Sequence, residues 1–139
     1  MSPQKRSVLM AKIKGKGTKC ELVVAQLLRT AGLSFDEHVR ELPGRPDFVL
    51  RDCKLVIFVD GDFWHGWRFS RWRLKLSEHW ERKIAGNIKR DERNFRKLRR
   101  AGWTVLRLWE HQVEKDAARC AARIKAAVEA RSQVSQSPL

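Results

Sequence analysis

The segment Leu42–His65, with the sequence LPGRPDFVLRDCKLVIFVDGDFWH, is the stretch around which we expect the rest of this chain to be organised. It contains two short apolar runs, Asp47–Leu50 and Leu55–Val59, on either side of a polar turn at Arg51–Lys54. Short runs rich in Val, Ile, Leu and Phe between turn residues are typical of strands. The segment therefore predicts a β-hairpin or a pair of adjacent strands.

Acidic residues stand at both ends of this predicted hairpin. Asp47 opens the first strand directly after Pro46, and Asp60 closes the second. In an antiparallel pair the start of one strand lies beside the end of the next, so we expect the two carboxylates to converge. Mg²⁺ binds through one or two carboxylates together with water and substrate phosphate, which makes the pair a candidate nuclease metal site. The alternative is that both acids are turn residues, which favour strand ends for local hydrogen bonding.

The composition indicates a basic, single-domain protein. The 139 residues include 30 Lys and Arg against 16 Asp and Glu, a formal net charge of +14. A chain of this length forms one domain with its own core. A basic excess spread along the whole chain indicates a polyanionic partner, with nucleic acid first and a membrane surface as the rival. No apolar run approaches the ~20 residues needed to span a bilayer, and no signal-peptide segment opens the chain.

The cysteines indicate a cytoplasmic location. Cys20, Cys53 and Cys120 are odd in number, widely spaced and without a CxxC pair. Such a pattern is typical of a reducing compartment and argues against a disulfide framework or an evident zinc site.

The chain divides into a basic arm at residues 1–17, a folded domain at 18–131 and a disordered tail at 132–139. Glu21 closes a capping-box spacing, S/T-x-x-E, at the start of a helix that ends at Gly32, and so has a sufficient structural role. The further expected elements are an edge strand at Phe35–Arg40, a helix from Ser77 to about Arg100, a strand at Trp103–Trp109 and a helix at Asp116–Ala130. This order predicts an α/β or α+β domain with a single sheet.

Two features outside the hairpin suggest chemistry or DNA contact. The loop after Asp60 interleaves Trp, Phe and Arg, which offer aromatic faces to bases and cations to phosphates. The alternative is a loop that folds back and buries its aromatic rings. In the long helix, Asp91 interrupts the apolar stripe, and a buried carboxylate is costly unless paired. Its partner is either a nearby Arg or Lys or a catalytic histidine.

The motifs in this order closely resemble the very short patch repair (Vsr) DNA endonucleases. The resemblance rests on the basic arm, TKCELVVAQLL, LPGRPDFV, VIFVDGDFWH, a helix with W-x3-I-x6-D, and GWTVLRLWE, and covers about Arg6 to His111. It implies a restriction-endonuclease-like α/β fold with a single mixed sheet flanked by helices. It also implies Mg²⁺-dependent cleavage of one DNA strand beside a T·G mismatch.

The resemblance assigns roles to particular residues. Asp47 and the main-chain carbonyl of Val59 match the metal ligands, and His65 matches the histidine that activates water. Glu21 and Asp91 match supporting acids. The residues expected to contact DNA are Met10, Lys12 and Lys14 in the arm, Arg45, and the aromatic residues Phe63, Trp64 and Trp80, which match those that wedge into DNA next to the mismatch.

Some positions depart from the family pattern. The second catalytic histidine of the family is Asp60 here, which moves the site toward the wider PD-(D/E)xK pattern, in which a second acid completes the metal shell. The structural zinc ligands of the family correspond to Asp62, Trp67, Phe69 and His111. Because Trp and Phe cannot ligate zinc, we expect no zinc site.

We therefore predict a DNA endonuclease that hydrolyses a phosphodiester with Mg²⁺ and nicks one strand, as in T·G mismatch repair. Its catalytic set is Asp47, Asp60, Glu21, Asp91 and His65. The alternatives are a restriction-like or structure-specific nuclease of a defence system, a non-cleaving DNA-binding accessory module, and an RNA-binding protein. The expected partner is double-stranded DNA and not a membrane. Other repair or modification proteins are candidate partners, and a monomer is favoured.

Overall fold

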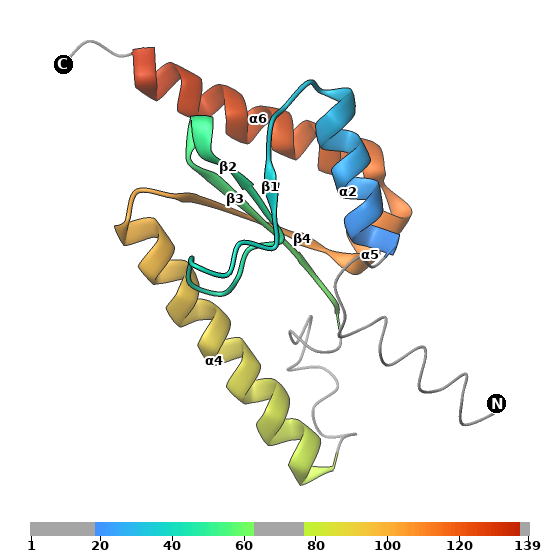
Figure 1. Cartoon of the computed structure of the whole chain (residues 1–139). Helices are drawn as coiled ribbons and strands as arrows, with labels where there is room; N and C mark the ends of the chain where they lie inside the picture. The colour runs from blue at the N-terminus through green and yellow to red at the C-terminus, as the bar shows by residue number, and fades with distance from the viewer. Residues whose placement is uncertain (1–18, 63–76, 137–139) are drawn as a thin grey trace.

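The computed structural model describes residues 19–62 and 77–136, with side chains as far as residue 131 (Figure 1). The expected arm at 1–17 and the aromatic loop at 63–76, which includes Phe63, Trp64 and His65, lie outside the described residues.

One four-stranded sheet forms the centre of the domain. Its strands are β1 (Asp36–Glu37), β2 (Phe48–Leu50), β3 (Leu55–Asp60) and β4 (Thr104–Trp109), side by side in that order. The pairs β1–β2 and β2–β3 are antiparallel, whereas β3 and β4 are parallel. The predicted hairpin is therefore confirmed. A parallel pair needs a long crossover, and the long helix α4 (Glu78–Arg100) lies within the segment that connects β3 to β4.

Helices cover both faces of the sheet (Figure 1). Helices α2 (Lys19–Thr30), α5 (Glu110–Lys115) and α6 (Ala117–Gln136) lie on one face, and α4 (Glu78–Arg100) lies on the other. This arrangement confirms the predicted mixed sheet flanked by helices. None of the described helices is long and apolar enough to cross a membrane.

The side chains of β3 alternate between the two halves of the core. Leu55 and Ile57 pack in the cluster formed with α2 and α6, whereas Val56 and Phe58 pack in the cluster formed with α4. Successive side chains of a strand point to opposite faces, so a strand covered on both faces is apolar at nearly every position. This explains why the run LVIFV shows no alternation of apolar and polar residues.

The predicted helix boundaries are largely confirmed. The Ser77 hydroxyl accepts a hydrogen bond from the Trp80 N–H at 3.4 Å and caps α4. Gly32 follows α2 with a φ of +72°, in the left-handed region that glycine adopts at low cost.

Two predicted elements need correction, and one element is additional to the prediction. The edge strand expected at Phe35–Arg40 is only two residues long. The last helix continues from the predicted end at Ala130 to Gln136, into the segment expected to be a disordered tail. The short helix α5 was not predicted, because six residues are too few to show a helical period.

Candidate nuclease site at one end of the sheet

Four acidic side chains singled out from the sequence are buried or nearly buried. Glu21, Asp60 and Asp91 expose only 7%, 6% and 9% of their surface, and the Asp47 side chain exposes 16%. Glu21 comes from the first turn of α2, Asp47 directly precedes β2, Asp60 ends β3, and Asp91 lies on α4. Buried carboxylates are costly unless they are paired or bind a metal, so each needs a partner.

Asp47 is held by the neighbouring strand. Its Oδ2 accepts a hydrogen bond from the main-chain N–H of Val59 at 2.7 Å. Because β2 and β3 run antiparallel, the start of β2 lies beside the end of β3, where Asp60 follows Val59. The hydrogen bond fixes Oδ2 of Asp47, and the carboxyl group also shares a side-chain hydrogen bond with Glu21.

The surroundings raise the pKa of Asp47 to about 8. Burial is the main cause, since it disfavours the charged carboxylate, and the negative charges of Glu21 and Asp60 add to it. The hydrogen bond from Val59 acts in the opposite direction. A divalent cation beside Asp47 would favour the ionised carboxylate, so the donor set fits a hard metal ion.

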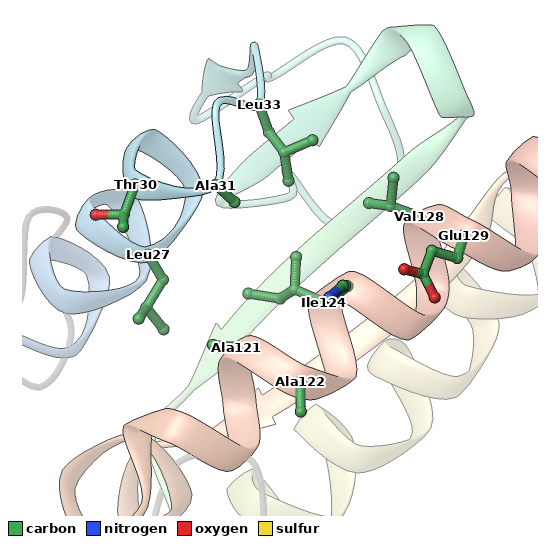
Figure 2. A pocket seen from close by; sticks show the side chains of 10 residues that line it. Leu27, Thr30, Ala31, Leu33, Ala121, Ala122, Ile124, Val128 and Glu129 are labelled. Carbon is green, nitrogen blue, oxygen red and sulfur yellow. The ribbon is translucent and has the colours of Figure 1, made fainter.

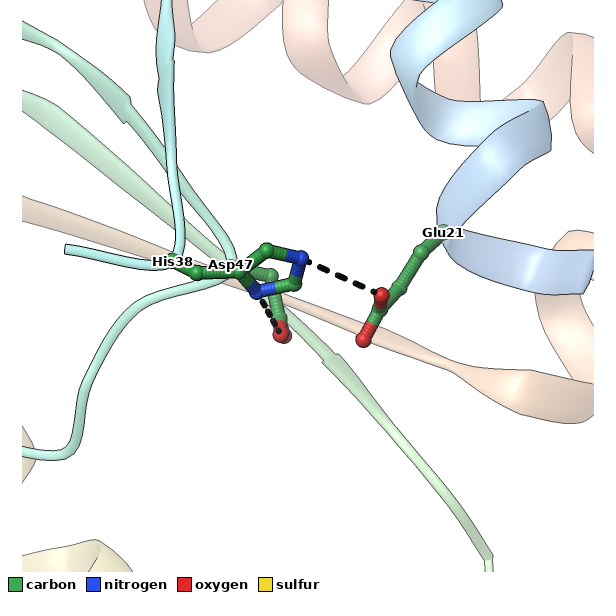
Figure 3. Close-up of side chains that lie close together, drawn as sticks. All are labelled: Glu21, His38 and Asp47. Atoms are coloured by element: carbon green, nitrogen blue, oxygen red, sulfur yellow. Dashed lines mark ion pairs between the residues drawn. The ribbon is translucent and has the colours of Figure 1, made fainter. Parts of the chain in front are cut away.

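His38 lies between Asp47 and Glu21 (Figure 3). Its Nδ1 is 3.8 Å from Asp47 Oδ1, and its Nε2 is 3.6 Å from Glu21 Oε2. Among the described residues, these three form a group whose potential metal-ligating atoms all lie within 4.8 Å of one another. Sequence reasoning missed His38. Its position in an expected edge strand, beside the strand that Asp47 opens, was the available signal.

Asp60 and Asp91 share a cation that sequence reasoning also missed. Arg107 donates from Nε to Asp60 Oδ2 at 2.7 Å and from Nη2 to Asp91 Oδ2 at 2.9 Å. The guanidinium lies 4.1 Å from the centre of the Trp109 ring and 5.1 Å from that of Phe95. Among the described residues, Asp91 therefore has an arginine as a partner. The other partner considered, the catalytic histidine His65, lies outside the described residues. The signal was a basic residue at a position of β4 that faces α4.

A second histidine–carboxylate contact lies at positions that correspond to zinc ligands of the resembled family. His111 Nδ1 is 2.9 Å from Asp62 Oδ1, and both side chains are about half-buried. The two residues therefore join the end of β3 to α5 directly.

The residues expected to bind DNA are only partly described. Arg45 is exposed in the turn before β2, and Trp80 is half-buried in the first turn of α4, with Lys83 Nζ 5.4 Å from the centre of its ring. The other expected contacts, Met10, Lys12, Lys14, Phe63 and Trp64, lie outside the described residues, as does His65.

A separate apolar groove of about 610 Å³ lies between α2 and α6 (Figure 2). Its lining includes Leu27, Leu33, Ile124 and Val128. Glu21 belongs to the first turn of α2, whereas Leu27 belongs to its second half. The groove is therefore distinct from the group of acids.

Comparisons with known proteins give a consistent result. A family described as "DNA mismatch endonuclease Vsr" matches residues 1–71. The chain is 37% identical to a protein named Type II nicking enzyme V.NmeDIP from Neisseria meningitidis serogroup C, over 92% of this chain and 88% of that protein. It is 38% identical to Type II nicking enzyme V.XorIIP from Xanthomonas oryzae pv. oryzae, over 79% of this chain and 82% of that protein. It is 39% identical to DNA mismatch endonuclease Vsr from Escherichia coli K12, over 76% of this chain and 69% of that protein.

Proposed function

Because this chain belongs to the Vsr family of DNA mismatch endonucleases, we propose that the acids at the end of its sheet form the catalytic centre of a strand-nicking endonuclease. The chain is a Vsr-like DNA endonuclease, as the sequence motifs predicted. The proposal concerns its substrate, its metal ion and the residues that act. The proposed substrate is a duplex with a T·G mismatch, of which one strand is cut.

Asp47, the main-chain carbonyl of Val59 and Asp60 are the proposed Mg²⁺ ligands. Asp47 supports this assignment because its Oδ2 is fixed by the Val59 N–H while its raised pKa indicates an acid that lacks a compensating cation. The bound ion would polarise the scissile phosphate and neutralise charge that develops in the transition state.

Arg107 limits what Asp60 can contribute. The guanidinium holds Asp60 Oδ2 and Asp91 Oδ2, and all three side chains are at least three-quarters buried. Asp60 Oδ2 is therefore held by Arg107 and would reach a metal ion only at the expense of that contact. Arg107 belongs to β4, and its two hydrogen bonds connect this strand to Asp60 at the end of β3 and to Asp91 of α4.

His65 is the proposed general base. A histidine has an unperturbed pKa of about 6.5, which suits removal of a proton from water near neutral pH. The proposed role of Asp91 is to orient this ring, as carboxylates do for other catalytic histidines, and that of Glu21 is to support the metal site through water.

Positive charge supports DNA as the partner. The net charge is +14, and the exposed side of α4 carries a series of basic residues, namely Lys89, Arg90, Arg93, Arg96, Lys97, Arg99 and Arg100. Such surfaces contact phosphates without reading sequence. Arg45, Trp80 and the arm residues Met10, Lys12 and Lys14 are proposed DNA contacts, as are Phe63 and Trp64. A monomer and a cytoplasmic location remain proposals.

The observation that carries the proposal is the buried Asp47 carboxylate fixed on the Val59 N–H beside Glu21 and Asp60. The test compares nicking of a T·G-mismatched duplex with nicking of a matched duplex, in Mg²⁺ or in EDTA. We expect Mg²⁺-dependent nicking of the mismatched duplex, abolished in Asp47→Ala while DNA binding persists. An Asp47→Ala protein that still cuts would refute the assignment. Linearised plasmid would favour the restriction-like alternative, and binding without cleavage the accessory module.

A further inference from the structure

His38 has no role in the function proposed above, yet its ring lies between two of the acids of the site (Figure 3). Its side chain is about four-fifths buried and faces Glu21 from one ring nitrogen and Asp47 from the other. The backbone of β1 and β2 sets this placement. The His38 N–H donates to the Asp47 carbonyl at 3.0 Å, so the two residues lie opposite each other beyond the paired residues Glu37 and Phe48.

The backbone of His38 also adopts an uncommon conformation. Its φ is +51°, in the left-handed region that is rare for residues other than glycine, although His is enriched there relative to bulkier residues. Such conformations are strained and are concentrated at functional sites. The main-chain hydrogen bond to Asp47 holds the two residues side by side, and the ring lies beside the acids (Figure 3).

The distance between His38 and Asp47 suits two ligands of one ion. At 3.8 Å, His38 Nδ1 and Asp47 Oδ1 are too far apart for a hydrogen bond. Two donor atoms that each lie about 2.1 Å from an ion, at about 90–110° to each other, are about 3.0–3.4 Å apart. A small side-chain movement therefore brings both atoms to one ion. Asp47 Oδ1 is the oxygen close to His38 Nδ1, whereas Oδ2 accepts from the Val59 N–H.

Glu21 completes a recurrent arrangement. A histidine that ligates a metal through one nitrogen usually donates its other N–H to a carboxylate, which fixes the tautomer and the ring orientation. His38 Nε2 lies 3.6 Å from Glu21 Oε2, whereas Nδ1 is the ring nitrogen near Asp47 (Figure 3). Glu21 is 93% buried and belongs to the first turn of α2, so its carboxylate is a well-positioned acceptor.

We propose that His38 is a further ligand of the divalent ion at Asp47, through Nδ1, and that Glu21 orients its ring by accepting from the Nε2–H. This inference rests on the proposed function, since it adds a ligand to the same site. A nitrogen ligand changes which ions the site favours. Imidazole suits transition metal ions, whereas Mg²⁺ prefers oxygen ligands. The site is therefore expected to bind Mn²⁺ or Co²⁺ more tightly than Mg²⁺.

The test measures metal binding directly and not activity. Full-length protein is titrated with Mn²⁺, and electron paramagnetic resonance separates free from bound ion, with Mg²⁺ as competitor. Spin-echo modulation of the bound Mn²⁺ then reports whether a ¹⁴N atom is a ligand. The variant is His38→Gln, which keeps a polar side chain of similar reach but removes the imidazole. The matched control is His79→Gln, at an exposed position in the first turn of α4.

We expect His38→Gln to lower the Mn²⁺ affinity by about tenfold or more and to remove the ¹⁴N signal. Its Mg²⁺ affinity should change by less than about threefold, because Mg²⁺ gains little from imidazole. His79→Gln should leave both affinities and the ¹⁴N signal unchanged. An unchanged ¹⁴N signal in His38→Gln, or an equal loss of Mn²⁺ and Mg²⁺ affinity, would overturn the proposal and make His38 a partner of the acids only. Circular dichroism and thermal melting verify that the variants are folded.

Asp47→Asn separates this inference from the proposed function. Loss of all divalent binding in Asp47→Asn, together with full Mn²⁺ binding and ¹⁴N signal in His38→Gln, supports the metal site but refutes the role of His38. Full divalent binding in Asp47→Asn refutes the proposed metal site itself, and with it a role of His38 as a ligand beside Asp47.

Discussion

Replacing Asp47 by Asn should stabilise the metal-free protein, and the gain should increase with pH. In the folded state the pKa of Asp47 is raised to about 8, mainly by burial, from an ordinary value of 3.8. Between these two values the unfolded chain has released a proton that the folded chain keeps. Stability must therefore fall as pH rises through this window. An asparagine does not titrate, and its amide oxygen can still accept the hydrogen bond from Val59.

The slope follows from linkage. Each rise of one pH unit within the window lowers the free energy of unfolding of the wild type by up to about 1.4 kcal/mol. Solvent screening is limited, because the Asp47 side chain is only 16% exposed. Local relaxation reduces the effect. Between about pH 5.5 and about pH 7.5, the advantage of Asp47→Asn over the wild type should therefore grow by roughly 1–3 kcal/mol. In a domain of this size that corresponds to roughly 4–10 °C in Tm.

The assay is thermal melting of both proteins in EDTA across this pH range, without DNA. The wild-type Tm should fall relative to that of Asp47→Asn as pH rises, and Mg²⁺ or Mn²⁺ should restore only the wild type. Parallel Tm curves in EDTA would refute the raised pKa of Asp47, and with it the argument that this acid lacks a compensating cation.

Two further predictions concern how the site is held. Arg107→Leu should lower the free energy of unfolding by about 3–5 kcal/mol in urea titrations, because it leaves the buried Asp60 and Asp91 without their shared cation. The loss should be much smaller in an Asp60→Asn, Asp91→Asn background, and an equal loss there would contradict the pairing. Gly44→Ala should destabilise by at least about 1 kcal/mol, because φ is +78° and a Cβ would lie 3.1 Å from an aromatic ring of β3. Gly86→Ala, at an open position of α4, should instead stabilise by about 0.5–1 kcal/mol, and similar effects of the two alanines would disprove this account.

The local order of residues was enough to predict the hairpin and to place Asp47 and Asp60 at its ends. The run LVIFV and the turn after Leu50 are strand and turn signals that act over a few residues. An antiparallel neighbour then follows from a short connection, which places Asp47 beside the end of β3. Helix ends at Gly32 and Ser77 were predicted for the same reason, since capping depends on residues within one turn. The family was also identified correctly from motif order.

Partners that are distant in sequence were decided only by the tertiary structure. The parallel register of β3 and β4 places Phe58 opposite Arg107, so that the arginine reaches both Asp60 and Asp91. No local pattern contains that register. It depends on how α4 packs across the sheet.

The contacts of His38 could not be predicted from the sequence for the same reason, because they join residues that are distant along the chain. Its side chain meets Glu21 of α2 and Asp47, which precedes β2, only after the short strand β1 pairs with β2 and α2 packs on the sheet. The sequence by itself therefore determined the fold class, the nuclease family and the acids of the candidate site. The tertiary structure decided which cation each acid meets, because strand register and helix packing, and not sequence spacing, bring these charges together.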